Sequence, residues 1–79
     1  MIPESVVARV FGVPRHSVTD QTSNTTLEAW DSLNHVTLIM ELEAAYGVSF
    51  SAEETLTMTD VAAIKRVLED HGAAWNGST

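Results

Sequence analysis

Cysteine is absent from this chain of 79 residues, so the fold contains no disulfide and offers no thiolate to a metal ion. The three histidines, at positions 16, 35 and 71, do not show the short local spacing that metal ligands have. The sequence therefore predicts no metal site.

Long apolar runs are also absent, since no run approaches the roughly 20 residues that span a bilayer. The N-terminus lacks the basic segment and apolar core of a signal peptide. We therefore expect no membrane insertion and a cytoplasmic location. At this length we expect a monomer with a single domain over residues 1–79, an ordered core over about 3–72 and a flexible tail over about 73–79.

Basic residues are scarce, which gives the chain a net charge of -7. The only four are Arg9, Arg15, Lys65 and Arg66. No base lies between His16 and Ile64, and that span holds eight carboxylates. The negative electrostatic field of these carboxylates repels nucleic acid and anionic membranes but attracts basic protein surfaces. We expect protein partners with basic faces; the alternative is that the acids only keep a small protein soluble.

Apolar periodicity predicts three principal helices. Pro3 suits a first turn and Gly12 a stop, which places the first helix at residues 3–12. The second, over residues 32–46, has an apolar stripe at intervals of four residues and ends before a glycine. Thr59 is the expected N-cap of the last helix, which ends near position 71.

A capping box at Ser51 and Glu54 predicts one short helix between the last two. Residues 13–30 read as a long ordered loop, held across the core by Val18, Leu27 and Trp30. The expected fold is all-α, an antiparallel bundle of three principal helices plus one short helix. Its predicted core is Val7, Val10, Phe11, Leu38, Leu42, Tyr46, Phe50, Val61, Ile64 and Leu68.

The run Trp30-Asp31-Ser32-Leu33 stands where the loop gives way to the second helix. An aspartate at the N-cap accepts backbone N–H bonds, and the positive end of the helix dipole then falls on Ser32. Because such a helix start stabilises anions, the position suits a serine that carries a phosphodiester. A nucleophilic serine with His35 as its base is the enzymatic alternative, but an exposed helix end offers no water-excluding pocket or oxyanion hole.

A longer pattern follows from this run, and it consists of Asp31-Ser32-Leu33-Asn34, Val36, Leu38, Ile39, Leu42, Glu43 and Tyr46-Gly47-Val48. This pattern resembles the 4′-phosphopantetheine attachment region of acyl carrier proteins, and the resemblance runs from about Leu27 to His71. The chain departs from the family pattern at Thr37 and Ala44, where acids are common, and in the lead-in 27–30. These departures resemble specialised carriers of lipid, polyketide or secondary-metabolite pathways.

The resemblance implies an acyl-carrier-protein-like fold and a non-catalytic function. Ser32 would carry the arm, flanked by Asp31 and Leu33, and acyl groups would be held on it as thioesters. The implied partners are a phosphopantetheinyl transferase using coenzyme A, an acyl-loading ligase or acyltransferase, and a ketosynthase or other acyl-processing enzyme. An aminoacyl or peptidyl carrier remains an alternative, as does an interaction module whose arm is unused.

A second apolar row on the central helix consists of Leu33, Val36 and Met40, rotated away from the core stripe. We interpret this row as the docking face for partner enzymes, because methionine adapts to varied surfaces. In carrier proteins acids accompany such a row, so the resemblance adds Glu41 and Glu43 to the face, together with Thr37 at a position where an acid is common. The alternative is one broad buried face that contacts both flanking helices.

Overall fold

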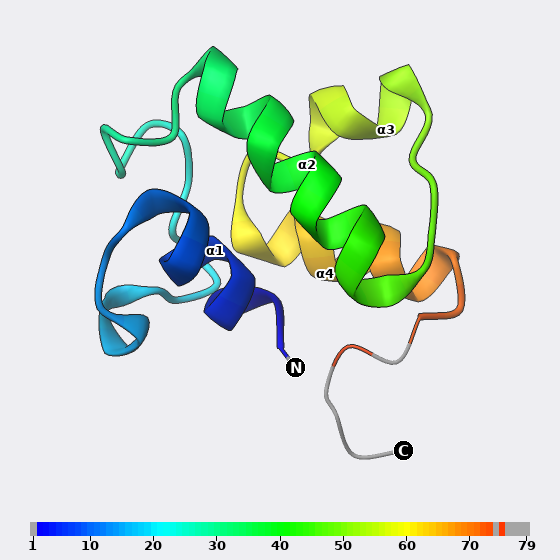
Figure 1. The fold of residues 1–79 in the computed structure, drawn as a ribbon, viewed down its shortest axis with the longest axis horizontal. Helices are drawn as coiled ribbons and strands as arrows, with labels where there is room; N and C mark the ends of the chain where they lie inside the picture. The colour runs from blue at the N-terminus through cyan, green and yellow to red at the C-terminus, as the bar shows by residue number, and fades with distance from the viewer. Residues whose placement is uncertain (1, 74, 76–79) are drawn as a thin grey trace.

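The computed structural model describes residues 2–73 and Trp75, and its helices agree with the sequence prediction. The elements are α1 (Pro3–Phe11), a 3-10 turn η1 (Arg15–Ser17), α2 (Ser32–Tyr46), α3 (Ala52–Thr57) and α4 (Val61–Asp70). Figure 1 shows α2 crossing the view in front of α4, with α1 and α3 on opposite sides. Three principal helices, one short helix and a long loop before α2 are confirmed. None of the helices described is long and apolar enough to cross a membrane.

The central helix α2 has well-defined ends. Its N-cap is Asp31, as predicted, and its C-cap is Gly47, whose φ of 66° is a left-handed conformation that glycine adopts without strain. The backbone N–H groups of Gly47 and Val48 both donate to the carbonyl of Glu43, at 2.9 and 3.3 Å. The chain therefore leaves α2 sharply, and Val48 and Phe50 return to the core as partly buried side chains.

Side-chain contacts also fix the start of α3. Ser51 and Glu54 form the predicted capping box, with each side chain bonded to the other residue's backbone N–H. The Ser51 N–H, together with the His71 side chain beyond α4, lowers the pKa of Glu54 below its usual range. Glu54 lies 3.0 Å from His71 Nε2, so it links α3 to the end of α4.

The N-cap of α4 is Asp60, and the prediction of Thr59 was wrong by one residue. Asp60 Oδ1 accepts the Ala63 N–H at 2.6 Å, whereas the Thr59 carbonyl accepts the N–H of Asn24 at 3.0 Å. A carboxylate is also a stronger acceptor than a hydroxyl at such a position. The Asp60 side chain is therefore the cap, and the backbone of Thr59 joins the start of α4 to the long loop.

The long loop packs across the core through the three apolar residues that the sequence indicated. Val18 and Trp30 are buried, and Leu27 packs against the core cluster. The first N–H groups of α4 donate to loop carbonyls, at 3.1 Å to Thr22 and at 3.2 Å to Asp20. These bonds satisfy donors that a helix start leaves open, which explains why a loop rich in polar residues stays fixed.

The core lies between α1, α2 and α4 and is close to the predicted one. Of the ten residues expected there, seven are buried: Val7, Phe11, Leu38, Leu42, Val61, Ile64 and Leu68. Val10, Tyr46 and Phe50 are only partly buried. Burial and the nearby charge of Glu4 raise the pKa of Tyr46 to about 12. The predicted core did not include Val6 and Met58, which are fully buried.

The predicted flexible tail can be compared with the structure at two positions only. Ala73 and Trp75 are partly buried and pack against the core cluster. The Trp75 indole N–H donates to Glu69 at 3.2 Å, and Lys65 Nζ lies 4.7 Å from the Trp75 ring centroid. Residue 74 and residues 76–79 of the predicted tail lie outside the described residues.

Lys65 on α4 joins three parts of the fold. Its Nζ lies 2.7 Å from Glu4 on α1 and 2.6 Å from Asp20 on the loop. Burial alone lowers the pKa of Lys65, but hydrogen bonds and charge from these two carboxylates raise it above its usual value. The side chain of Glu4 is only 13% exposed, and its Oε1 is buried without a hydrogen-bond partner in the described chain.

Replacing Lys65 by methionine is expected to lower the free energy of unfolding by about 1 to 3 kcal/mol, because Glu4 would stay largely buried without its cation. Urea denaturation would measure the change. Arg66→Met, at an exposed position on the same helix, is the matched control and is expected to stay within about 0.5 kcal/mol of the unsubstituted chain. Equal stability of the two variants would contradict a structural role for the Lys65 contacts.

Candidate functional site

Ser32 is the first residue of α2, and its side chain is exposed. The backbone of Asp31 is extended, and Asp31 Oδ1 accepts the N–H of Asn34 at 2.9 Å. The side-chain amide of Asn34 in turn donates to the carbonyl of Ala29 at 2.8 Å. The helix start is therefore held from both sides, which fixes the position of Ser32.

The electrostatics at Ser32 favour a phosphate ester. The N–H groups of Ser32 and Leu33 belong to the first turn and have no acceptor within the helix, so the positive end of the dipole is open there. The carboxylate of Asp31 is next to the site, but its Oδ1 is occupied by Asn34. An exposed hydroxyl beside two free N–H donors fits a covalently attached phosphate.

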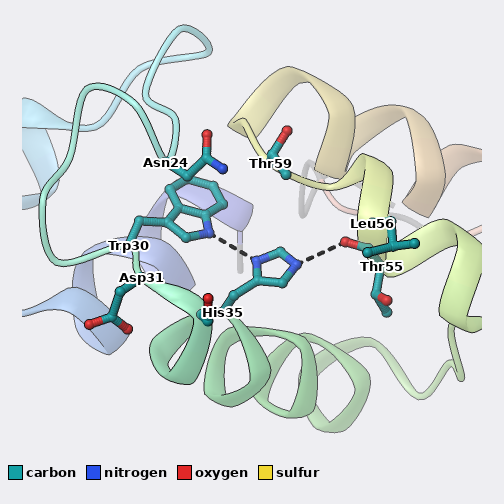
Figure 2. Close-up of a pocket in the computed structure, with 8 residues that line it drawn as sticks. Asn24, Trp30, Asp31, His35, Thr55, Leu56 and Thr59 are labelled. Carbon is teal, nitrogen blue, oxygen red and sulfur yellow. Dashed lines mark hydrogen bonds between the residues drawn. The ribbon is translucent and has the colours of Figure 1, made fainter.

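An open pocket lies beside Ser32, between the start of α2, the long loop and α3. Its volume is about 440 Å³, and Figure 2 shows its lining residues. They are Asn24, Trp30, Asp31, Ser32, His35, Thr55, Leu56 and Thr59. The sequence analysis singled out Trp30, Asp31, Ser32 and His35, which are close together in the chain, but not the remaining four residues, which reach the pocket through tertiary packing.

His35 does not pair with Ser32 as a catalytic base would. The Trp30 indole N–H donates to His35 Nδ1 at 2.9 Å, so that nitrogen is the acceptor and the ring proton belongs on Nε2. Nε2 then donates to the carbonyl of Thr55 at 2.8 Å. Because both ring nitrogens are engaged, neither can take a proton from Ser32, and the structure favours the non-catalytic interpretation.

The predicted apolar row of α2 is exposed. Leu33 is 76% exposed, Val36 56% and Met40 63%, so the row is not part of the chain's core. Leu56 on α3, which the sequence did not single out, is 78% exposed and lines the pocket beside Ser32. Four large apolar side chains are therefore free for contact with another molecule.

The polar residues assigned to the docking face have contacts of their own. Glu41 forms an ion pair with Arg9 of α1 at 2.8 Å, with both side chains about half exposed. Glu43 Oε2 accepts the N–H of Phe50 at 2.9 Å and so holds the chain that leaves α2. Thr37 is exposed, and its hydroxyl lies 3.5 Å from the carbonyl of Leu33.

Among the described residues, no group of three or more histidines or acids is placed to hold a metal ion. A small helical bundle with an exposed serine at the capped start of its central helix has the architecture of a carrier domain. The family model described as "Phosphopantetheine attachment site" matches residues 4–68, from the first turn of α1 to the last turns of α4. The chain therefore belongs to this family.

Membership defines the cofactor and the general function. The prosthetic group is a covalently attached 4′-phosphopantetheine, and the chain is a phosphopantetheine-carrying carrier protein. Carrier domains of this kind are generally not catalysts; they present groups bound to the arm to partner enzymes. The computed model carries no ligand, and the exposed hydroxyl, the free N–H groups and the open pocket fit such an arm.

Proposed function

We propose that Ser32 is the attachment residue and that the chain is an acyl carrier protein. The observation that carries this proposal is the exposed Ser32 hydroxyl at the start of α2, beside the Asp31 cap. In the attachment reaction, Ser32 Oγ forms a bond to phosphorus in the pyrophosphate of coenzyme A. The attacked phosphorus is the one that bears the pantetheine, its bond to the bridging oxygen breaks, adenosine 3′,5′-bisphosphate leaves, and a base of the transferase takes the hydroxyl proton.

The proposed docking surface starts at the attachment residue and follows the exposed row Leu33, Val36 and Met40. Thr37, Glu41 and Glu43 border this row. Because Glu41 and Glu43 already have partners within the chain, we expect the apolar row to supply most of the contact energy. The net charge of -7 would attract basic faces of the transferase, a loading ligase or acyltransferase, and a ketosynthase.

Acyl cargo is preferred over aminoacyl or peptidyl cargo because the motif at Ser32 resembles the acyl carriers. Thr37 and Ala44, in place of the usual acids, favour a specialised lipid, polyketide or secondary-metabolite pathway. We also propose a monomeric, cytoplasmic protein without catalytic activity of its own. Mass spectrometry of the protein from its native cells would identify the group on the arm, and an amine-bearing cargo would favour the peptidyl alternative.

Incubation of the unmodified chain with coenzyme A and a broad-specificity phosphopantetheinyl transferase is expected to add one arm per molecule. Intact mass would show a single shifted species, and a reaction without coenzyme A is the control. A second addition would contradict a unique attachment residue. A chain that stays unmodified, while another carrier protein is modified under the same conditions, would support an interaction module without an arm.

A further inference from the structure

The pocket beside Ser32 contains polar groups that the fold does not use. Within the described part of the chain, the side-chain amide of Asn24 and the hydroxyl of Thr59 make no hydrogen bond, although both line the pocket. Their backbones are tied together at 3.0 Å, so the two side chains are held at one place. Figure 2 shows them on the opposite side of the pocket from His35.

Three other residues of the pocket form a continuous hydrogen-bonded bridge. It runs from the Trp30 indole N–H to His35 and from His35 to the carbonyl of Thr55, through bonds of 2.9 and 2.8 Å. The bridge joins the loop, α2 and α3 across the pocket, as Figure 2 shows. Trp30 is only 3% exposed and belongs to the core cluster that also contains the fully buried Leu38 and Met58.

Resting on the proposed attachment at Ser32, we infer that this pocket receives the amide-bearing part of the arm and that the Trp30–His35–Thr55 bridge keeps aliphatic cargo out of the helical core. The phosphopantetheine arm carries a hydroxyl and two amides, which match the free Asn24 amide and Thr59 hydroxyl. Because the arm is tethered at Ser32 on the pocket rim, its effective concentration in the pocket is high.

The same geometry opposes deep entry of a hydrocarbon chain. A chain that entered the core at the bridge would have to separate His35 from Trp30 or from Thr55. A partly buried donor and acceptor would then be left unpaired beside an apolar group, which is more costly than the net loss of one hydrogen bond. The cargo class that this carrier suits is therefore short or polar acyl groups, held near the surface.

The test begins with holo protein whose single modification has been verified by intact mass, so failure of attachment is detected separately. Heteronuclear NMR would compare the unmodified and holo chains. We expect the Asn24 side-chain amide and the Thr59 amide signals to shift, while the Trp75 indole signal serves as an internal reference. Holo protein without a shift at Asn24 and Thr59 would overturn the arm site.

A double variant and a matched control test whether Asn24 and Thr59 bind the arm. Asn24→Ala combined with Thr59→Val is expected to remove the arm-dependent shift of the His35 ring signals without preventing modification. Gln21→Ala, an exposed position on the same loop that does not line this pocket, is the matched control and should behave as the unsubstituted holo protein does. An arm-dependent His35 shift that persists in the double variant would contradict the assignment of these two residues.

Cargo exclusion is tested by loading acetyl and octanoyl groups on the holo protein. We expect hydrogen exchange of the Trp30 indole N–H, and cleavage of the thioester by hydroxylamine, to agree within about twofold for the two cargoes. Exchange at Trp30 that is about tenfold faster with octanoyl cargo would show that the bridge opens for the chain. Hydroxylamine cleavage that is about tenfold slower for the octanoyl than for the acetyl thioester would show that the octanoyl chain is buried. Either result would overturn the proposed exclusion of aliphatic cargo.

Discussion

Substituting alanine for Ser32 is expected to abolish phosphopantetheinylation completely and to leave the fold intact. The hydroxyl supplies the oxygen of the phosphodiester, and no neighbouring side chain can replace it. Ser32 is exposed and Asp31 supplies the cap, so the free energy of unfolding should change by no more than about 0.5 kcal/mol. Intact mass after treatment with the transferase and urea denaturation measure the two effects.

Ser51→Ala is the matched control, because Ser51 also stands at a helix start but serves as the N-cap of α3. We expect this variant to be fully modified and to lose about 1 kcal/mol of stability through the broken capping box. The two serines should therefore give opposite results in the two assays. A Ser32→Ala chain that still gains the arm, or that loses its helical circular dichroism, would contradict the assigned role.

Leu42→Ala is expected to lower the free energy of unfolding by about 2 to 5 kcal/mol, because Leu42 is fully buried and its loss leaves a cavity between the helices. A domain of this size has little stability to lose, so a large part of the population could unfold. Met40→Ala, on the same helix but 63% exposed, should cost no more than about 0.5 kcal/mol. Urea denaturation of both variants separates the core face of α2 from its outer face.

The Met40 variant also tests the docking surface. If Met40 contacts the transferase, Met40→Ala should slow modification while the melting temperature hardly changes. A Met40→Ala chain as unstable as Leu42→Ala would place the outer row in the core. A stable variant that the transferase modifies as fast as the unsubstituted chain would show that Met40 is not part of the docking surface.

The helices and the Asp31 cap before Ser32 could be predicted because their signals are local. The stripe of Leu38 and Leu42 follows the helical period, and Asp31 caps the residues directly after it, so neighbours in sequence decide both. The loop crossing was predictable in part, since Val18 and Trp30 are isolated apolar residues in a polar stretch. The partial exposure of Tyr46 could not be predicted, because the periodicity of apolar residues does not show how far a core extends.

Contacts between distant residues could not be read from the sequence. The carbonyl of Thr59 accepts the N–H of Asn24, a contact across the fold that joins the long loop to the start of α4. The pairing of Glu41 with Arg9 joins side chains 32 positions apart. The pocket likewise depends on the bridge from Trp30 through His35 to Thr55, and no local pattern indicates that these three residues meet.

The most direct test of the account is to locate the arm within the modified chain. A protease that cleaves after glutamate would release residues 29–41, in which Ser32 is the only serine and Thr37 the only other hydroxyl residue. The account predicts that fragment-ion spectra place the whole added mass between Asp31 and Leu33. Added mass on Thr37, or on any peptide outside residues 29–41, would contradict Ser32 as the residue that makes this chain a carrier.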